Sequence, residues 1–189
     1  MKNQEQKTIL LVEDDIATMM IEEHLLKSFG YDVVPAKSGE AAVQIATGNN
    51  KIALILMDVN LGDGIDGPEA ARQILLKRNL PIVFLSSHTE KEYVERIKGI
   101  AGYGYVVKNS GGCVLQSSIE MAFKLFDAQD RGRLANDVLK RLNHPGRTTD
   151  TVRDILQIVQ KSTGFEAVGI RLPEGDDFPY YQTSGFPDS

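Results

Sequence analysis

The sequence predicts an α/β fold: a doubly wound, five-stranded parallel sheet that helices cover on both faces. Two observations predict it. Five short apolar runs alternate with five helical patterns along the first two thirds of the 189-residue chain, and this alternation is typical of parallel sheets. In addition, the run at residues 52–57 is apolar at every position, as expected for a strand that is buried on both faces of such a sheet.

The run at residues 52–57 ends abruptly in the carboxylate of Asp58, and a loop rich in glycine and aspartate follows it. Glycines at positions 62, 64 and 67 interrupt regular structure there. We therefore expect Asp58 at the carboxyl end of a central strand. In open α/β sheets, this edge is where ligands bind and chemistry takes place.

The other strands are expected at residues 8–12, 31–35, 82–85 and 103–107, and the proline in the second of these suits an edge strand. The helix that follows the first strand is expected to bury one apolar stripe and to stop at Gly30. That stripe comprises Ile16, Met19, Met20, Leu26 and Phe29.

Three further helices are expected at residues 38–48, 68–80 and 89–99. The last of these is expected from a capping-box pattern. A fifth helix is expected to begin at Ser110. Since crossovers between parallel strands are right-handed, few topologies remain. We expect the flavodoxin-like strand order 2-1-3-4-5, in which the first and third strands lie side by side at the switch point.

The composition is that of a globular protein, with 42% hydrophobic and 25% charged residues. The net charge of −5 argues against a chain that mainly binds nucleic acid. The single cysteine, Cys113, cannot form an internal disulfide and is expected to be a small packed residue. No apolar signal-peptide core is present at residues 1–7, and no apolar run approaches the ~20 residues that span a bilayer. We therefore expect a soluble, cytoplasmic protein.

Four of the predicted strands lead into polar residues that can share one site. They are Glu13 and Asp14 after the first strand, Asp58 after the third, Ser86 after the fourth and Lys108 after the fifth. Three carboxylates in one pocket repel one another, and Mg²⁺ suits such an oxygen-rich site. An ionised aspartate beside Mg²⁺ can attack phosphorus to give an aspartyl phosphate. Lys108 and Ser86 can contact the phosphate oxygens.

The motifs that carry these residues lie at 9–15, 56–61, 81–86 and 104–108. In their order and spacing they resemble the receiver domain of two-component response regulators. Each motif is weak alone, but the four together are highly specific. The resemblance implies a module that takes a phosphoryl group from a histidine kinase or phosphotransfer protein.

The resemblance also implies a role for each site residue. Asp58 is implied to be the phosphoacceptor, with Ser86 and Lys108 completing the catalytic group. The implied Mg²⁺ ligands are Glu13, Asp14, Asp58 and the main-chain carbonyl of Asn60. Ser86 and Tyr105 are implied to form the switch that reports phosphorylation.

Two positions depart from the family pattern. Asn109 follows Lys108, where the family usually has a proline, often in a cis peptide bond. A cis bond before a non-proline residue costs ~3 kcal/mol, so the loop is expected to be trans or strained. Ser86 stands where the family usually has threonine, and it keeps the hydroxyl group.

Other site classes fit less well. An EF-hand loop starting at Asp58 would need glycine at its sixth position, which is Asp63. Neither of the two common glycine-rich nucleotide-binding motifs is present. An aspartate-nucleophile phosphatase usually carries a second aspartate two residues after the nucleophile, whereas here Asn60 cannot shuttle a proton. We therefore expect no enzyme that turns over external substrates, although phosphatase activity stays an alternative.

Beyond the receiver pattern, helical periodicity continues through an extension and linker at residues 129–147. It fits either two separate helices or one continuous signalling helix. Residues 148–189 are expected to form a helix and two strands, and they resemble the opening of a GAF-type sensor domain. The expected domains are thus a receiver at residues 1–128, this extension, and a partial GAF-like segment.

This organisation implies a module that relays phosphorylation to a downstream sensor or kinase module. The alternative is the N-terminal part of a DNA-binding transcriptional regulator, but no nucleic-acid or membrane partner is expected for this chain itself. A homodimer through the C-terminal helix is a further possibility, because two strands and one helix cannot enclose a core.

Overall fold

The computed structural model describes residues 6–87, 100, 102–142, 148–171 and 180–184. The chain divides into two compact units, Met1–Phe126 and Asp127–Ser189, which we describe separately. Three predicted features lie outside the described residues: the helix at residues 89–99, the linker near residue 145 and the turn near residue 175.

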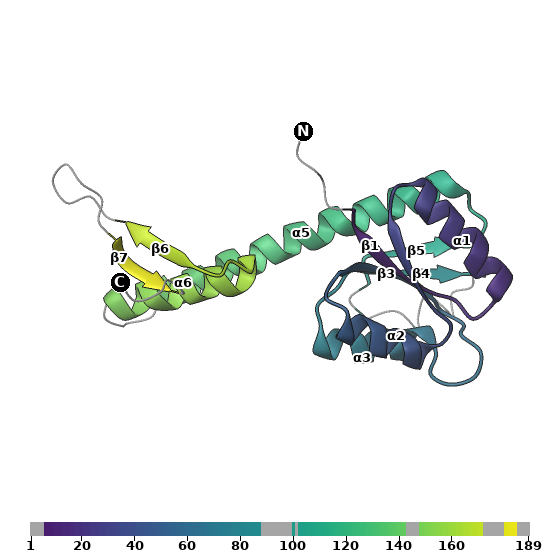
Figure 1. The fold of residues 1–189 in the computed structure, drawn as a ribbon, viewed down its shortest axis with the longest axis horizontal. Coiled ribbons are helices and arrows are strands. Elements are labelled where there is room, and N and C mark those ends of the chain that lie inside the picture. The colour runs from purple at the N-terminus through teal and green to yellow at the C-terminus, as the bar shows by residue number, and fades with distance from the viewer. Residues whose placement is uncertain (1–5, 88–99, 101, 143–147, 172–179, 185–189) are drawn as a thin grey trace. The chain divides into compact units, whose positions relative to one another are not determined.

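The first unit contains the parallel sheet that the sequence predicts (Figure 1). Its strands are β1 (Thr8–Val12), β2 (Asp32–Ala36), β3 (Ile52–Asp58), β4 (Ile82–Ser86) and β5 (Gly104–Val107). They lie in the order β2-β1-β3-β4-β5, and every neighbouring pair is parallel. This confirms the flavodoxin-like topology, with β2 at the edge and β3 in the centre.

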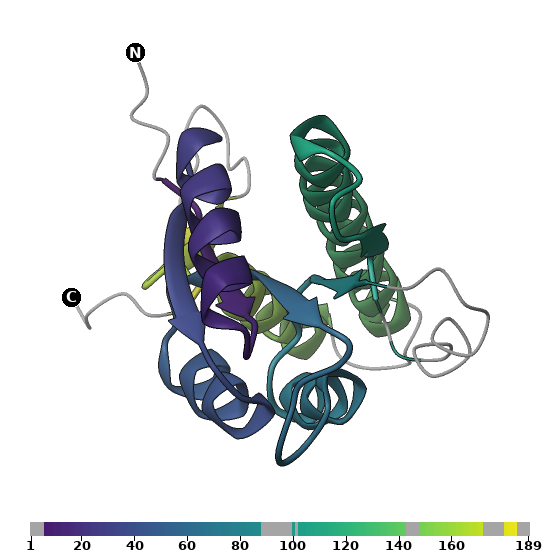
Figure 2. The ribbon, with the colours of Figure 1, turned by 90° about the vertical axis from the view of Figure 1, so that its right-hand side faces the viewer.

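The helices that the structure describes in this unit lie on the two faces of the sheet (Figures 1 and 2). They are α1 (Ile16–Ser28), α2 (Gly39–Gly48), α3 (Gly67–Lys77) and the start of α5 (Gly112–Leu142). Side chains of α2 and α3 pack with one face of the sheet into one buried cluster, and side chains of α1 and α5 pack with the other face into a second. The sheet is therefore buried on both faces, which explains its nearly continuous apolar strands.

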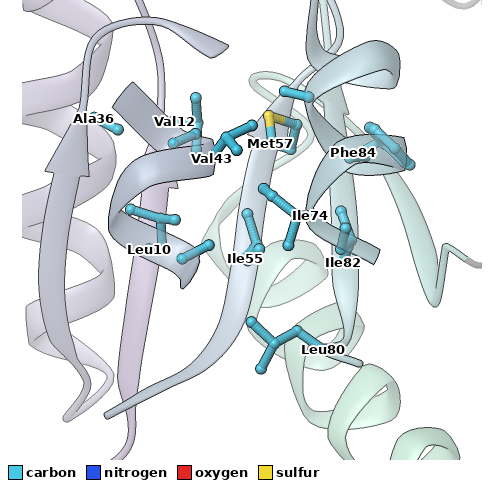
Figure 3. Close-up of a cluster of buried hydrophobic side chains, with 14 of the residues drawn as sticks. Leu10, Val12, Ala36, Val43, Ile55, Met57, Ile74, Leu80, Ile82 and Phe84 are labelled. Carbon is cyan, nitrogen blue, oxygen red and sulfur yellow. The ribbon is translucent and has the colours of Figure 1, made fainter. Parts of the chain in front are cut away.

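Figure 3 shows the first of these clusters, in which Ile55 and Met57 of β3 lie close to Ile74 of α3. Leu10, Ile55 and Ile82 come from three adjacent strands and are fully buried. Burying an aliphatic side chain of this size stabilises a fold by roughly 1.5–3 kcal/mol. The cluster thereby fixes the central strands whose carboxyl ends carry the polar residues.

Three of the described helices begin at a side-chain cap, of which only Ser38 was predicted from the sequence. Asp15, Ser38 and Asp66 accept hydrogen bonds from backbone amides three residues further along the chain. These bonds satisfy amide groups that a helix start otherwise leaves unpaired. They also set where α1 and α3 leave the functional edge of the sheet.

The predicted stripe of α1 is wrong in part. Ile16 and Met20 are 58% and 66% exposed, whereas Met19, Glu22 and Leu26 are buried. Positions 19, 22 and 26 share one helical face by their spacing of three and four residues. The sequence of α1 is apolar on more than one side, so residue type alone does not select the buried face.

Two further expectations need correction near the start of α5. Cys113, expected to be packed, is exposed. The helix begins at Gly112 and not at Ser110, because residues 108–111 form a turn with Asn109 and Gly111 at positive φ. Beyond this point α5 is one continuous helix of 31 residues, which selects the continuous alternative for the extension.

The second unit contains α6 (Thr148–Thr163) and the antiparallel pair of β6 (Val168–Arg171) and β7 (Tyr180–Ser184). Gly164 ends α6 at a φ of 69°, a conformation that glycine adopts without a side-chain penalty. The helix contacts both strands. Within the described part of the chain, no helix is both long and apolar enough to cross a membrane.

Candidate functional site

The polar residues predicted at the strand ends meet at one edge of the sheet. The neighbouring strands are in register there, since Val12 pairs with Met57, Asp58 with Leu85, and Ser86 with Val107. Glu13 and Lys108 directly follow β1 and β5. Residues from four strands, separated by up to 95 positions in the sequence, therefore converge on one site.

Glu13, Asp14 and Asp58 form a compact carboxylate cluster. One oxygen atom of each residue lies within 4.8 Å of the others. Glu13 and Asp58 are only 1% and 4% exposed, whereas Asp14 faces solvent. A set of hard oxygen donors with one side open to water fits Mg²⁺, which keeps several water ligands and prefers carboxylates. The donor set therefore suits the metal that the sequence predicts.

Lys108 is held inside this cluster by two ion pairs. Its Nζ donates to Glu13 Oε2 at 2.5 Å and to Asp58 Oδ2 at 2.7 Å, and its side chain is only 10% exposed. Burial lowers the pKa of the Lys108 ammonium group, but the hydrogen bonds to Asp58 and Glu13 outweigh this and raise the pKa overall. Lys108 is therefore a fixed positive charge beside Asp58.

The same surroundings disfavour ionisation of the Glu13 carboxyl group beside Asp58. Burial raises the pKa of Glu13, and the nearby charge of Asp58 adds to the increase although Lys108 opposes it. Two carboxylates thus share one ammonium group, which leaves the cluster with excess negative charge. A divalent cation would relieve that repulsion.

The loop between β3 and α3 is tied to the cluster by backbone hydrogen bonds. The Asn60 amide donates to Asp58 Oδ1 at 3.2 Å, and the Gly62 amide donates to Asp14 Oδ2 at 3.1 Å. Further along, the Ile65 amide donates to Glu40 Oε1 at 2.9 Å. These contacts hold the loop over the site, including the Asn60 carbonyl that is predicted as a metal ligand.

Gly67 lies so close to Asp58 that no other residue fits without a shift. A Cβ atom built at position 67 would lie 1.9 Å from the Asp58 carbonyl oxygen, far inside van der Waals contact. The start of α3 can therefore approach the end of β3 only because position 67 is glycine. The sequence pattern indicates only a loop at this glycine and does not show its packing role.

The predicted switch residues lie on β4 and β5. Ser86 ends β4 and is fully buried. Tyr105 pairs with Phe84 across β4 and β5 and packs, partly buried, against the core cluster of α2 and α3. The structure thus places Ser86 on the strand next to β3 and Tyr105 one strand further out, with Tyr105 further from the strand end than Ser86.

The turn after Lys108 resolves the question raised by Asn109. The described residues contain no cis peptide bond, and Asn109 has a φ of 65°. Asparagine tolerates this left-handed conformation better than most residues. The trans alternative for the Lys108–Asn109 bond is therefore the one found, with the local strain taken up by Asn109.

A cavity of about 600 Å³ extends from the carboxylate cluster to the region between α1 and the start of α5. Its wall includes Glu22, which sequence reasoning missed. Burial raises the pKa of Glu22 to about 7, and the negative charge of Glu13 contributes. The available signal was its helical spacing, which puts Glu22 on the same face as Met19 and Leu26.

Comparison with known proteins agrees with this geometry. Residues 9–120 match the family model described as response regulator receiver domain. A similar curated protein is the transcriptional regulatory protein PdtaR of Mycobacterium tuberculosis, 34% identical over 123 residues. That alignment covers 64% of this chain and 58% of PdtaR, so the chain matches little more than half of that relative.

Solved structures show the same fold. The N-terminal domain of a response regulator/sensory box/GGDEF three-domain protein from Carboxydothermus hydrogenoformans is 42% identical, with a TM-score of 0.62, and the match covers 65% of this chain and 98% of that one. The receiver domain of a sensor histidine kinase from Pseudomonas aeruginosa, with a magnesium ion in its active site cleft, is 29% identical, with a TM-score of 0.58 and coverage of 63% and 98%. With a family match over more than half of its length, the chain belongs to the response regulator receiver family.

Proposed function

We propose that this chain accepts a phosphoryl group on Asp58 from a histidine kinase or phosphotransfer protein, and so acts as the phosphoacceptor of a phosphorelay. The observation that carries the proposal is the environment of Asp58. Its buried carboxylate lies at the end of the central strand, next to two further carboxylates and 2.7 Å from Lys108. Few other functions need one ionised nucleophile between a cation site and a fixed ammonium group.

The chemistry follows from the positions of these groups. An Asp58 carboxylate oxygen attacks phosphorus, the new O–P bond forms, and the bond to the donor atom breaks with its electron pair leaving on the donor. Lys108 can then pair with a phosphoryl oxygen, since it already contacts Asp58. The residues that would hold Mg²⁺ are Glu13, Asp14, Asp58 and the carbonyl of Asn60, and the bound ion supplies neutralisation of phosphoryl charge.

The related receiver domain from Pseudomonas aeruginosa, described with a magnesium ion in its active site cleft, supports this choice of metal. It is only 29% identical, so the stronger support is the donor set of this chain. All three side-chain ligands offer oxygen, and no cysteine or histidine of the described residues joins them. Softer metals would favour nitrogen or sulfur ligands.

Turnover of external phosphate esters is the competing activity, and the geometry favours it less. Asn60, two residues after the nucleophile, contacts Asp58 through its main-chain amide. Its amide side chain cannot supply the proton that a leaving alkoxide needs. We therefore propose a receiver that gains and loses its own phosphate. Steady-state release of phosphate from a generic ester would support the phosphatase instead.

The signal is proposed to pass from Asp58 through Ser86 and Tyr105 and onward along α5. Support comes from Ser86 and Tyr105 lying on the two strands beyond β3, and from the 31-residue length of α5. We further propose that residues 148–189 begin a GAF-type sensor domain, because a helix followed by two antiparallel strands is consistent with such an opening. The name of PdtaR supports transcriptional output as the alternative.

The test is phosphorylation of the full chain by acetyl phosphate with Mg²⁺, measured by intact mass. Wild type and the control Asp63→Asn, which changes an exposed aspartate of the adjacent loop, should each gain one phosphate. Asp58→Asn should gain none, because its amide is not a nucleophile for phosphorus. Equal uptake by Asp58→Asn would contradict the proposal.

A further inference from the structure

Glu22 of α1 is a buried carboxylate that the phosphoacceptor chemistry does not use. The residue is only 9% exposed, and its Oε2 atom is buried without a hydrogen-bond partner among the described residues. Burying a polar oxygen without a partner costs free energy, and more so when it is charged. Such an atom in a native structure calls for a missing partner, such as a bound ligand.

The cavity beside Glu22 has space for that partner. Its volume of about 600 Å³ lies within the range of small-molecule sites, roughly 300–1,000 Å³. Part of the wall is aliphatic, beside polar residues such as Thr18 and Ser110. The aliphatic residues are Ile21 and Leu25 of α1, Leu85 of β4, Val106 and Val107 of β5, and Leu115 of α5.

The charged residues that line the cavity indicate the sign of the charge that a ligand should carry. Glu13, Asp15, Glu22 and Asp58 contribute carboxylates, and Lys108 is the cation among the lining residues. Lys108 Nζ is already bonded to Glu13 and Asp58. Among the lining residues that the structure describes, no further positive group is present to form an ion pair with Glu22. A cationic ligand is therefore favoured over an anionic one.

The surroundings of Glu22 also distinguish an organic cation from a metal ion. Glu22 is not part of the compact cluster of Glu13, Asp14 and Asp58, and a hard divalent ion needs several oxygen ligands together. A single carboxylate with aliphatic neighbours suits an ammonium or amidinium group instead. An amidinium can donate two parallel hydrogen bonds to one carboxylate, as a guanidinium does.

We propose that this cavity binds a small organic cation, whose ammonium or amidinium head pairs with Glu22 and whose apolar body lies against Ile21, Leu25 and Leu115. This site lies beside Asp58, but ligand binding there does not require phosphorylation of Asp58. Binding supplies the partner that Glu22 Oε2 lacks and removes apolar wall from water.

The test uses benzamidine as the cation and benzamide as a neutral molecule of nearly the same shape. The full-length protein is titrated with each at pH 8, above the pKa of Glu22, in saturating Mg²⁺, which occupies the carboxylate cluster. Amide chemical shifts are followed. Benzamidine should bind and shift Ile21, Leu25, Gly112 and Leu115. Benzamide should bind about tenfold more weakly or worse, because it lacks the charge that pairs with Glu22.

Two variants identify the carboxylate. Glu22→Gln keeps the shape but removes the charge, and should weaken benzamidine binding by about tenfold or more. Glu23→Gln changes the next residue of α1, which pairs with Lys27 at the surface, and should bind as wild type does. Absence of benzamidine binding to wild type, equal binding by Glu22→Gln, or shifts confined to residues 13, 14 and 60 would each overturn the inference.

Discussion

Lys108 Nζ lies 2.7 Å from Asp58 Oδ2, although the two residues are 50 positions apart in the sequence. Because this contact exists before any phosphate arrives, the ammonium group needs little movement to reach a phosphoryl oxygen on Asp58. The same group also neutralises part of the charge of Glu13. Lys108 therefore has two roles, one in stability and one in the proposed chemistry, and they can be separated.

The stability role is tested with Lys108→Met, which keeps the aliphatic stem and removes the charge. Two buried carboxylates then lose their ion pair, and we expect unfolding free energy to fall by about 3 kcal/mol in metal-free buffer. Added Mg²⁺ should restore part of the loss, since a cation again faces Glu13 and Asp58. Urea denaturation followed by circular dichroism measures both effects. Lys124→Met, at an exposed position of α5, is the control; equal midpoints for the two variants would contradict the buried ion pair.

Asp14 is expected to contribute to Mg²⁺ affinity although it faces solvent. Asp14→Ala removes one of three clustered carboxylates and also the acceptor of the Gly62 amide. We expect Mg²⁺ to bind at least about tenfold more weakly, because ligand charge strongly tunes such sites. Isothermal titration measures this, with Asp63→Ala as the matched loop control. Unchanged affinity would remove Asp14 from the metal site.

Gly67 is expected to be required for the geometry of Asp58. In Gly67→Ala the new methyl group meets the Asp58 carbonyl oxygen at 1.9 Å unless the backbone moves. We expect a loss of about 2–3 kcal/mol in stability, as for other overpacked sites, and slower phosphorylation by acetyl phosphate. Gly48→Ala is the control, because a Cβ there has no atom within 4 Å. If both alanine variants behave alike, the close approach is not a constraint.

Glu22 is expected to make stability depend on pH. Its pKa is about 7 in the folded protein, against 4.5 for an ordinary glutamate. Between these values the folded state holds a proton that the unfolded state has released, so stability falls as pH rises through this window. Glu22→Gln stays neutral, and its advantage over wild type should grow from pH 5 to pH 8, to no more than about 3 kcal/mol.

Urea midpoints at the two pH values, in metal-free buffer, measure this effect. Glu13, Asp58 and Lys108 also act on Glu22, but all three are present in both proteins, so the difference reports Glu22. Glu23→Gln should follow wild type. A constant difference between Glu22→Gln and wild type across this pH range would show that Glu22 is ionised throughout.

The sequence predicts the strand order and the meeting of Glu13, Asp58 and Lys108, for a physical reason. Parallel strands have all their carboxyl ends at one edge, so apolar runs that end in polar residues identify that edge without any coordinates. The buried face of α1 could not be predicted in the same way. Ile16 and Met20 are as apolar as Met19, and only packing decides which of them faces the sheet.

The burial of Glu22 and the backbone conformation of Asn109 were not predicted, for a different reason. Glu22 begins a polar run with Glu23 and His24, and such a run normally indicates solvent-facing positions, yet Glu22 is buried in the folded chain. Asn109 has a positive φ within a turn. The absence of proline at this position permits that turn but does not require it. Both residues differ from local expectation, and both lie beside the site, where such departures are expected to concentrate.

The central claim, that Asp58 is the phosphoacceptor, is tested most directly by locating the modification. After reaction with acetyl phosphate and Mg²⁺, borohydride reduces an aspartyl phosphate to homoserine, and peptide mass spectrometry identifies the altered position. The proposal expects homoserine at position 58 alone, in wild type and in Asp63→Asn. Homoserine at Asp14 or Asp15, or an unmodified Asp58 in protein that has gained a phosphate, would contradict it.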